Sequence, residues 1–375
     1  MTRSFAAALR RANRLMRPAK LGKTGRSIQK TMTGLMVKSA MAALTPKPAK
    51  TPKAAVPKAG RSLGVVLKQL RAAQSLMPGA AGQTVAPRIP KGAQYLARVH
   101  RSAAGSRSYK LYLPASQPKR PKGLILMLHG CNQTPDDFAL GTHMNAMAEK
   151  HGLAIAYPAQ GRPDNPVSCW NWFKPGNQGR GAGEPAILAS LTRKLMKDLG
   201  LSRDAVFVAG LSAGGAMAAI LADVYPDVFS AAGIHSGLAR GAARDARSAV
   251  AAMRRGGAPE GGAVPPVIPR ARPVRRIVFQ GDADSTVHPS NAAMIVAAAV
   301  GPDATPGKIS KRSVRGRGYA RRDFAGPDGG VLLELWMLEG AGHAWSGGRA
   351  AGSYTDSKGP DATAQMIRFF LQKPA

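Results

Sequence analysis

The sequence predicts an α/β protein with a mostly parallel central sheet that is covered by helices on both faces. Two observations carry this prediction. Apolar strand candidates alternate with helix candidates along the second two thirds of the chain, and several of the strands, such as Gly123–Leu128, are apolar at every position. Strands that are apolar throughout are buried on both faces, as in a parallel sheet whose crossover helices pack on either side.

The elements can be placed in order along the chain. The first is a pair of strands, Leu96–His100 and Ser108–Leu113, joined by the small-residue turn Ala103–Ser106. The later strands are predicted at Gly123–Leu128, Leu153–Tyr157, Ala205–Val208, Ala231–Ile234, Arg276–Phe279 and Val331–Met337. Helical spacing predicts helices at Phe138–His151, Glu184–Leu199, Gly214–Val224, Asn291–Val300 and Ala362–Leu371. The segment Ala239–Arg275, which is rich in Ala, Arg, Gly and Pro, is predicted to be a surface insertion, with a loop favoured over a lid.

The front of the chain has a different composition. Lys and Arg number 26 before Asp136, where no acidic residue occurs, and 28 from Asp136 on, where all 20 acidic residues lie, so the net charge of +34 divides into +26 and +8. Residues 1–92 are predicted to be a basic extension with weak amphipathic helices and a Pro/Lys/Ala linker, followed by the α/β domain at 93–375. Such an arm suits an anionic surface or nucleic acid.

The compartment and the redox state are less constrained. No segment has the apolar length of a membrane span, and the first residues match no export signal, which favours an intracellular protein. Cys131 and Cys169 are the two cysteines, and spacing alone leaves a disulfide and two buried thiols equally open.

The segment Gly210–Leu211–Ser212–Ala213–Gly214 fits the G-x-S-x-G nucleophile elbow. An apolar strand candidate precedes it and a helix-forming run follows it, which is the context that the motif requires. The elbow predicts Ser212 as a nucleophile and an α/β-hydrolase fold. In that fold an acid and then a histidine follow the serine along the chain. Asp282 and Asp284 both qualify as the acid, and His343, on a glycine-flanked loop after a strand, is favoured as the base over His288.

A tetrahedral intermediate needs two backbone N–H donors at its oxyanion. Ala213, the residue after the nucleophile, is predicted to supply one. The other is predicted to come from His129–Gly130–Cys131–Asn132, a segment after an early strand that is here called the oxyanion loop.

At this point the chain resembles the poly(3-hydroxybutyrate) depolymerase family of esterases, which includes feruloyl and acetyl-xylan esterase relatives. The resemblance covers roughly residues 95–372. It rests on HGCNQT with Asp137–Phe138, Tyr157–Pro158, CWNW from Cys169, GLSAGG from Gly210 and GHAW from Gly342.

The resemblance implies roles for particular residues. The family's H-G-x-x-D-x-x-V pattern maps onto Gln280–Val287, which makes Asp284 the triad acid, and the resemblance also implies a Cys131–Cys169 disulfide and the Cys131 N–H as the second oxyanion donor. Gln280 replaces the family's usual His, and Ser346 stands where Pro is common. Neither position is in the triad, so both are expected to affect substrate fit.

The predicted function is therefore hydrolysis of poly(3-hydroxybutyrate) or its oligomers by a Ser212–His343–Asp284 acyl-enzyme mechanism, with no metal or organic cofactor. Trp170, Trp172, Trp345 and Asn132 are expected to bind the ester chain, because they lie within or beside the motif segments. A place in the apolar core is the alternative for the tryptophans, and for Trp172 the two interpretations are equally open. The family's substrate adds the surface of a polymer granule as a further partner for the basic arm. The alternatives are a feruloyl or acetyl-xylan esterase, which with most of the family would act outside the cell, and a non-enzymatic protein whose basic arm binds nucleic acid or an anionic surface.

Overall fold

The computed structural model describes residues 86–256, 273–300, 305–326 and 328–372. The helices and linker predicted in the basic extension lie outside the described residues, as does the 257–272 part of the predicted insertion. The domain boundary at residues 92 and 93 stays a prediction. Within the described part, no helix has the length and apolar character needed to cross a membrane.

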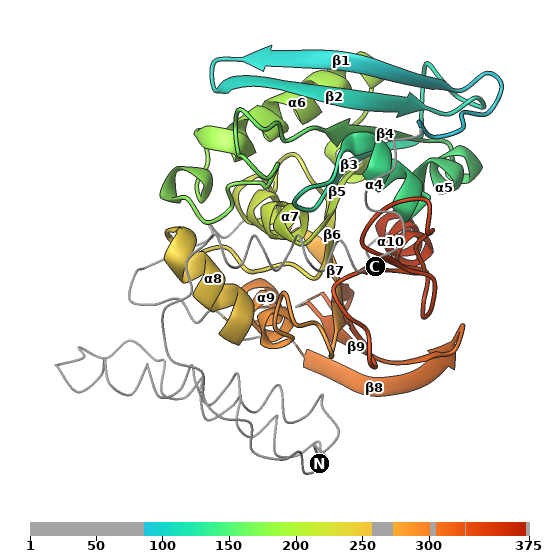
Figure 1. Ribbon diagram of the computed structural model, residues 1–375. Coiled ribbons are helices and arrows are strands. Elements are labelled where there is room, and N and C mark those ends of the chain that lie inside the picture. Colours follow the sequence, from blue (N-terminus) through green and yellow to red (C-terminus); the bar gives the residue numbers. More distant parts are fainter. Residues whose placement is uncertain (1–85, 257–272, 301–304, 327, 373–375) are drawn as a thin grey trace, which may run out of the picture.

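A ten-stranded sheet runs through the molecule in the order β1-β2-β4-β3-β5-β6-β7-β10-β9-β8 (Figure 1). Its six central strands, from β4 to β10 in that order, are parallel, and an antiparallel pair closes each edge. The strands are β1 (Gln94–Ser102), β2 (Gly105–Leu113), β3 (Gly123–Leu128), β4 (Leu153–Pro158), β5 (Val206–Leu211), β6 (Ala231–His235), β7 (Arg275–Gly281), β8 (Thr305–Val314), β9 (Arg317–Ala325) and β10 (Val331–Leu338). The predicted parallel sheet is confirmed, and β3, β4, β5 and β6 are buried at every residue.

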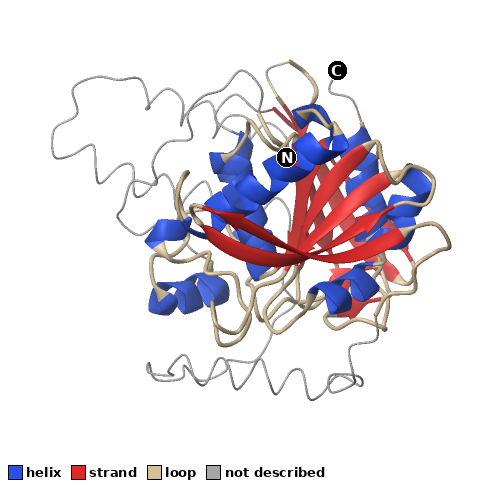
Figure 2. Cartoon of the chain, turned by 90° about the horizontal axis from the view of Figure 1, so that it is seen from above, coloured by secondary structure: helices blue, strands red, loops and turns tan. Residues whose placement is uncertain are grey.

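Helices cover both faces of this sheet (Figure 2). They are α4 (Pro135–Thr142), α5 (Met144–His151), α6 (Gly183–Leu199), α7 (Ala213–Val224), α8 (Ala246–Arg255), α9 (Ser290–Val300) and α10 (Ala362–Leu371), with short 3₁₀ helices at Pro175–Asn177 and Arg203–Ala205. Side chains of α6, α7, α8 and α9 share one apolar core, and those of α4, α5 and α10 share the other. Alternate residues of a strand serve the two cores: Leu124 and Leu126 face the first, whereas Ile125 faces the second.

Three elements differ from the sequence prediction. The predicted helix Phe138–His151 is two helices, because His143 adopts a left-handed conformation with φ 57° between them. Part of the segment predicted as a surface loop forms α8, whose first turn is closed by reciprocal hydrogen bonds between Asp245 and Ser248. The hairpin of β8 and β9, which turns at Arg315–Gly316, was not predicted.

Candidate active site

The elbow forms at the carboxyl end of β5, in the middle of the sheet. Ser212 has φ 57° and ψ −119°, a conformation that L-residues adopt only under strain, and α7 begins at the next residue. Its own N–H donates to the carbonyl oxygen of His235 at 2.9 Å. A Cβ atom on Gly210 would lie 2.3 Å from the carbonyl carbon of Gly214, and one on Gly214 would lie 2.0 Å from the carbonyl oxygen of Leu128. Both glycines of the motif are therefore required by close backbone contact.

The acid and the histidine come from neighbouring parallel strands. Asp284 follows β7 and His343 follows β10, and these two strands are paired, so the loops at their carboxyl ends meet. His343 Nδ1 lies 2.7 Å from Asp284 Oδ2. The other carboxylate oxygen, Oδ1, accepts hydrogen bonds from the N–H groups of Thr286 (2.9 Å) and Val287 (2.8 Å). The carboxylate of Asp284 is thus held on both oxygens, with its side chain fully buried.

These contacts decide the charge of Asp284. Burial acts to raise the pKa of its carboxyl group, but the nearby His343 and the hydrogen bonds from His343, Val287 and Thr286 outweigh burial, so the pKa is lowered below its ordinary value. Asp284 is therefore an anion at neutral pH. It can hold the His343 ring with Nδ1 protonated, which leaves Nε2 as the basic atom.

The rival residues lie elsewhere. Asp282 is exposed, and its carboxylate accepts a hydrogen bond from the N–H of Gly340 at 2.6 Å, as a turn-capping residue does. His288 is also exposed, and its Nδ1 lies 2.7 Å from Ser290 Oγ. The structure therefore brings Asp284, rather than Asp282, to His343.

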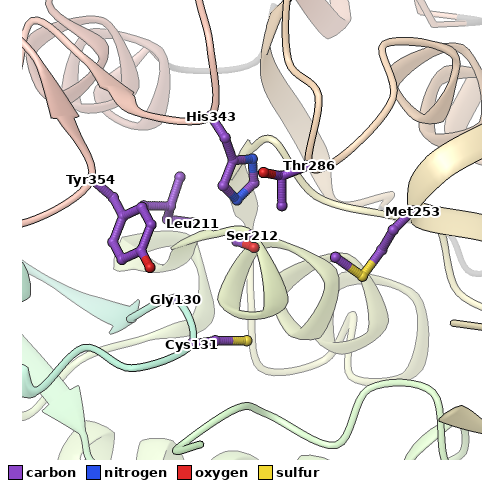
Figure 3. A pocket seen from close by; sticks show the side chains of 8 residues that line it. All are labelled: Gly130, Cys131, Leu211, Ser212, Met253, Thr286, His343 and Tyr354. Carbon is purple, nitrogen blue, oxygen red and sulfur yellow. The ribbon is translucent and has the colours of Figure 1, made fainter. Parts of the chain in front are cut away.

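Ser212 and His343 both line one pocket (Figure 3). In Figure 3 the imidazole of His343 lies over Ser212, with Tyr354 on one side and Met253 on the other. The residues that line it are Gly130, Cys131, Leu211, Ser212, Met253, Thr286, His343 and Tyr354.

The oxyanion loop forms another part of the pocket wall. The Gly130 N–H donates to Gln133 Oε1 at 2.9 Å, and the Asn132 N–H donates to the Val167 carbonyl at 2.9 Å. Between them, the Cys131 N–H has no hydrogen-bond partner among the described residues. The Ala213 N–H is at the first position of α7, where the helix offers no acceptor. Both N–H groups predicted as oxyanion donors therefore have no partner among the described residues and are available to a ligand.

Several groups fix the oxyanion loop from behind. A disulfide joins Cys131 to Cys169, as the resemblance implied, with the two Cα atoms 4.2 Å apart. The indole N–H of Trp170 donates to the His129 carbonyl at 3.0 Å, and the Gln160 N–H donates to His129 Nε2 at 3.0 Å. Burial lowers the pKa of His129 to about 4, so its ring is a neutral acceptor. These bonds tie the loop to the Cys169–Trp170 segment.

A second set of bonds ties the oxyanion loop to the segment that follows His343. Gln133 Nε2 donates to Asp137 Oδ2 at 2.9 Å and to the Ser353 carbonyl at 3.1 Å. The Ser353 N–H in turn donates to Asp137 Oδ1 at 2.8 Å. Nearby, β11 (Trp345–Ser346) pairs with β12 (Thr355–Asp356). This Gln133–Asp137–Ser353 bridge joins the two sides of the site.

His235, which was not predicted, lies beneath the site at the end of β6. It is fully buried, and its Nε2 accepts a hydrogen bond from the Ser346 N–H at 3.1 Å. Its ring stacks on Trp345 and Phe279, with ring centres 5.2 Å and 5.7 Å away. Burial, with a smaller effect of His343, lowers its pKa to about 3, so the ring is neutral. His235 therefore joins β6, the strand beside β5, to the loop that carries His343. In the sequence, only its place at the end of a buried strand marks it.

The two departures from the family pattern do not face the substrate as expected. Gln280 is buried, and its amide donates to the Val287 carbonyl at 3.0 Å and lies 3.3 Å from Asp284 Oδ2. Ser346 is buried and supplies the N–H that His235 accepts, a group that proline lacks. Gln280 thus contacts the loop that carries Asp284, and Ser346 lies on the segment after His343, where it contacts His235. Neither residue lines the pocket, so the expectation that they affect substrate fit is corrected.

The expected substrate-binding tryptophans are also placed differently. Trp170, Trp172 and Trp345 are 0%, 4% and 1% exposed, and none lines the pocket. The Trp345 indole donates to Thr363 Oγ1 at 3.0 Å. The rings of Trp170 and Trp172 pack in the core beneath α6 and α7, and the ring of Trp345 packs in the core shared by α4, α5 and α10. Asn132, the fourth expected substrate-binding residue, follows the pocket residue Cys131 in the oxyanion loop and has φ 62°.

Two pocket residues were missed. Met253 lies on α8, inside the segment predicted as a loop, and the capping pair Asp245 and Ser248 was the signal that a helix starts there. Tyr354 lies on the segment after His343 and has φ 51°. Nothing in the local sequence of Tyr354 marks it as a pocket residue.

Comparisons with known proteins identify relatives of this chain. The chain is 28% identical over 248 residues to poly(3-hydroxyalkanoate) depolymerase C of Paucimonas lemoignei, an alignment that covers 62% of this chain and 56% of that protein. It is 31% identical over 139 residues to feruloyl esterase B of Neurospora crassa, covering 37% of this chain and 46% of that protein. The chain thus spans about half the length of these two relatives.

Among solved structures, an acetyl xylan esterase from Aspergillus awamori superposes with a TM-score of 0.55 at 20% identity, covering 67% of this chain and 93% of that one. This likeness concerns the fold, and it confirms the predicted α/β-hydrolase architecture. The family profile described as esterase PHB depolymerase matches residues 107–315, which include the oxyanion loop, Ser212 and Asp284. Because this match covers more than half of the sequence, the chain belongs to the esterase PHB depolymerase family.

Proposed function

We propose that this chain is a serine carboxylic-ester hydrolase that uses Ser212 as nucleophile, His343 as base and Asp284 as the orienting acid. The observation that supports this proposal most is the 2.7 Å contact between His343 Nδ1 and Asp284 Oδ2 at a pocket that also contains the strained Ser212. A serine hydroxyl becomes a nucleophile when a base takes its proton, and the base works best when an acid fixes its tautomer.

In the proposed reaction, Ser212 Oγ attacks the carbonyl carbon of the ester while its proton passes to His343 Nε2. The N–H groups of Ala213 and Cys131 stabilise the oxyanion of the tetrahedral intermediate. His343 then gives the proton to the leaving alcohol, and the acyl group stays on Ser212. Water, deprotonated by His343, releases the acid and restores the hydroxyl group.

For the substrate, we propose poly(3-hydroxybutyrate) or its oligomers. The family of the chain and the name of its Paucimonas lemoignei relative support a polyester. The pocket walls of Met253 and Leu211 suit an aliphatic acyl chain. The Cys131–Cys169 disulfide favours an oxidising compartment, and hence the extracellular alternative rather than the intracellular one expected from the first residues.

The catalytic assignment is tested with Ser212→Ala and short p-nitrophenyl esters. Because the triad acts as a unit, we expect kcat to fall by roughly 10⁴-fold or more. Ser202→Ala is the matched control, since Ser202 is exposed on a loop and its side chain caps no helix. Wild-type turnover by the Ser212→Ala protein would refute the assignment.

The substrate is tested separately by incubating the wild-type protein with amorphous poly(3-hydroxybutyrate) granules, methyl ferulate and acetylated xylan. We expect soluble hydroxy acids from the granules at a rate that the Ser212→Ala protein does not reach. Cleavage of the ferulate or of the xylan esters alone would show that the protein is a feruloyl or acetyl-xylan esterase. The assignment of the triad would still stand.

A further inference from the structure

Tyr354 is a polar pocket residue that the proposed reaction does not use. It lies opposite Met253 across the nucleophile, and in Figure 3 its hydroxyl group lies on the side of Gly130 and Cys131. The wall at Tyr354 therefore carries a hydrogen-bonding group and the wall at Met253 is apolar, while Thr286 adds a second hydroxyl group to the lining. Such a lining suits a chain that carries a polar atom close to its reacting carbonyl.

The backbone holds Tyr354 in an unfavourable conformation. Its φ of 51° is uncommon for a bulky residue, and strain of this kind persists only where surrounding contacts impose it. Those contacts are present on both sides of the residue. The Trp345 N–H donates to the Tyr354 carbonyl at 2.7 Å, and the preceding residue, Ser353, belongs to the bridge with Gln133 and Asp137. The backbone of Tyr354 is thus held in place by its neighbours before any substrate binds.

The hydroxyl group is a neutral hydrogen-bond donor. Burial raises the pKa of Tyr354, and this effect exceeds the opposing effect of a hydrogen bond from the Asn132 side chain. A protonated phenol carries one O–H donor, which can bind an oxygen atom of a ligand. Asn132 also has a left-handed backbone, with φ 62°, in the oxyanion loop. The Tyr354 hydroxyl group therefore places a neutral donor in the pocket that also contains Ser212 and Cys131.

From this geometry we infer that Tyr354, oriented by Asn132, binds the oxygen on C3 of a 3-hydroxyacyl or 3-acyloxyacyl chain. In a 3-hydroxybutyrate unit this oxygen is the first polar atom along the chain from the carbonyl group, and the methyl group on the same carbon can face the apolar wall. Unsubstituted acyl chains and cinnamoyl chains carry no oxygen at C3, and an acetyl group has no C3. The inference rests on the proposed ester hydrolysis and specifies its acyl group.

The test compares p-nitrophenyl 3-hydroxybutyrate with p-nitrophenyl butyrate, which differ by one hydroxyl group. The measured quantity is the ratio of the two kcat/KM values. We expect the wild-type protein to favour the hydroxylated ester, and Tyr354→Phe, which keeps the ring, to lower the ratio about tenfold, the effect of one hydrogen bond to the substrate. Asn132→Gly, which tolerates the left-handed backbone, should lower the ratio in the same direction.

Tyr319→Phe is the control, because Tyr319 stacks on Trp336 in β10 and does not line the pocket. It should leave the ratio unchanged. A ratio that stays at the wild-type value in Tyr354→Phe, or an equal loss on both esters, would overturn the inference while Ser212-dependent hydrolysis stands. If the wild-type protein cleaves neither ester, the proposed function itself fails.

Discussion

Replacing His235 by glutamine is expected to weaken the dependence of stability on pH. In the folded protein the pKa of His235 is lowered to about 3, because burial and the neighbouring His343 disfavour a charged ring and the opposing effect of Asp284 is smaller. The ordinary value is 6.5. As the pH falls below that value, the unfolded chain binds a proton at His235 and the folded protein does not. The free energy of unfolding therefore decreases as the pH falls from about 6.5 toward 3.

The size of this loss of stability follows from the pKa shift of His235. Each pH unit over which only the unfolded state is protonated costs about 1.4 kcal/mol. Between about pH 7.5 and pH 4.5, only the roughly two units below the ordinary pKa of 6.5 contribute. His235 should therefore account for about 3 kcal/mol of the free energy of unfolding that the wild-type protein loses over this range. A glutamine side chain does not titrate, so that part should vanish in His235→Gln. His129, whose pKa is about 4, contributes equally in both proteins and cancels.

The assay is urea unfolding of both proteins at the two pH values with the disulfide intact. His235→Gln is expected to be less stable than wild type at pH 7.5, because it loses ring stacking on Trp345, while the glutamine amide keeps an acceptor for the Ser346 N–H. The difference between the two pH values is the result that matters. His288→Gln, at an exposed position, is the control. Equal losses of stability in wild type and His235→Gln would show that the buried ring is protonated in the folded state, and the reasoning would be wrong.

Two further predictions concern the triad and the elbow. Asp284→Asn should lower kcat on p-nitrophenyl esters by about 10⁴-fold, because the His343 ring loses the carboxylate that orients it. Asp282→Asn, the control, should stay within a few-fold of wild type. Equal effects of the two substitutions would contradict the choice of Asp284 as the acid. Gly214→Ala should destabilise the protein by several kcal/mol, since its Cβ would lie 2.0 Å from the Leu128 carbonyl oxygen, and Gly176→Ala, where nothing lies within 4 Å, should not. Thermal unfolding of the two alanine variants checks this, and similar melting temperatures would refute the packing argument.

The sequence was most informative where local pattern and tertiary structure agree. Strands such as β3 and β5 are apolar throughout because both of their faces are buried, so composition alone located them. The elbow was equally readable, since Gly210 and Gly214 are imposed by backbone contacts that other residue types cannot meet.

What the sequence did not reveal depends on contacts between distant segments. Trp345 lies beside a motif and was expected at the substrate, but its ring packs between His235 and Phe138, which belong to other elements. Tyr354 enters the pocket because Ser353 bonds to Asp137, more than 200 positions earlier in the chain. Met253 was hidden by the Ala, Arg and Gly content of its surroundings, although a helix forms there. Periodicity reports burial along one segment and carries no information about such pairings.

The bridge of Gln133, Asp137 and Ser353 holds Tyr354 by contacts that are separate from those of His343, so these two residues of the pocket can vary independently. His343 is held from the Asp284 side, whereas Tyr354 is held from the α4 side through Ser353. A change of side chain at 354 therefore alters the shape and polarity of the acyl wall without passing through the bond that orients the imidazole. In a directed-evolution experiment, position 354 is the place to look for altered substrate preference with turnover retained, and the loop 280–287 is the place where almost every change should reduce turnover on all esters.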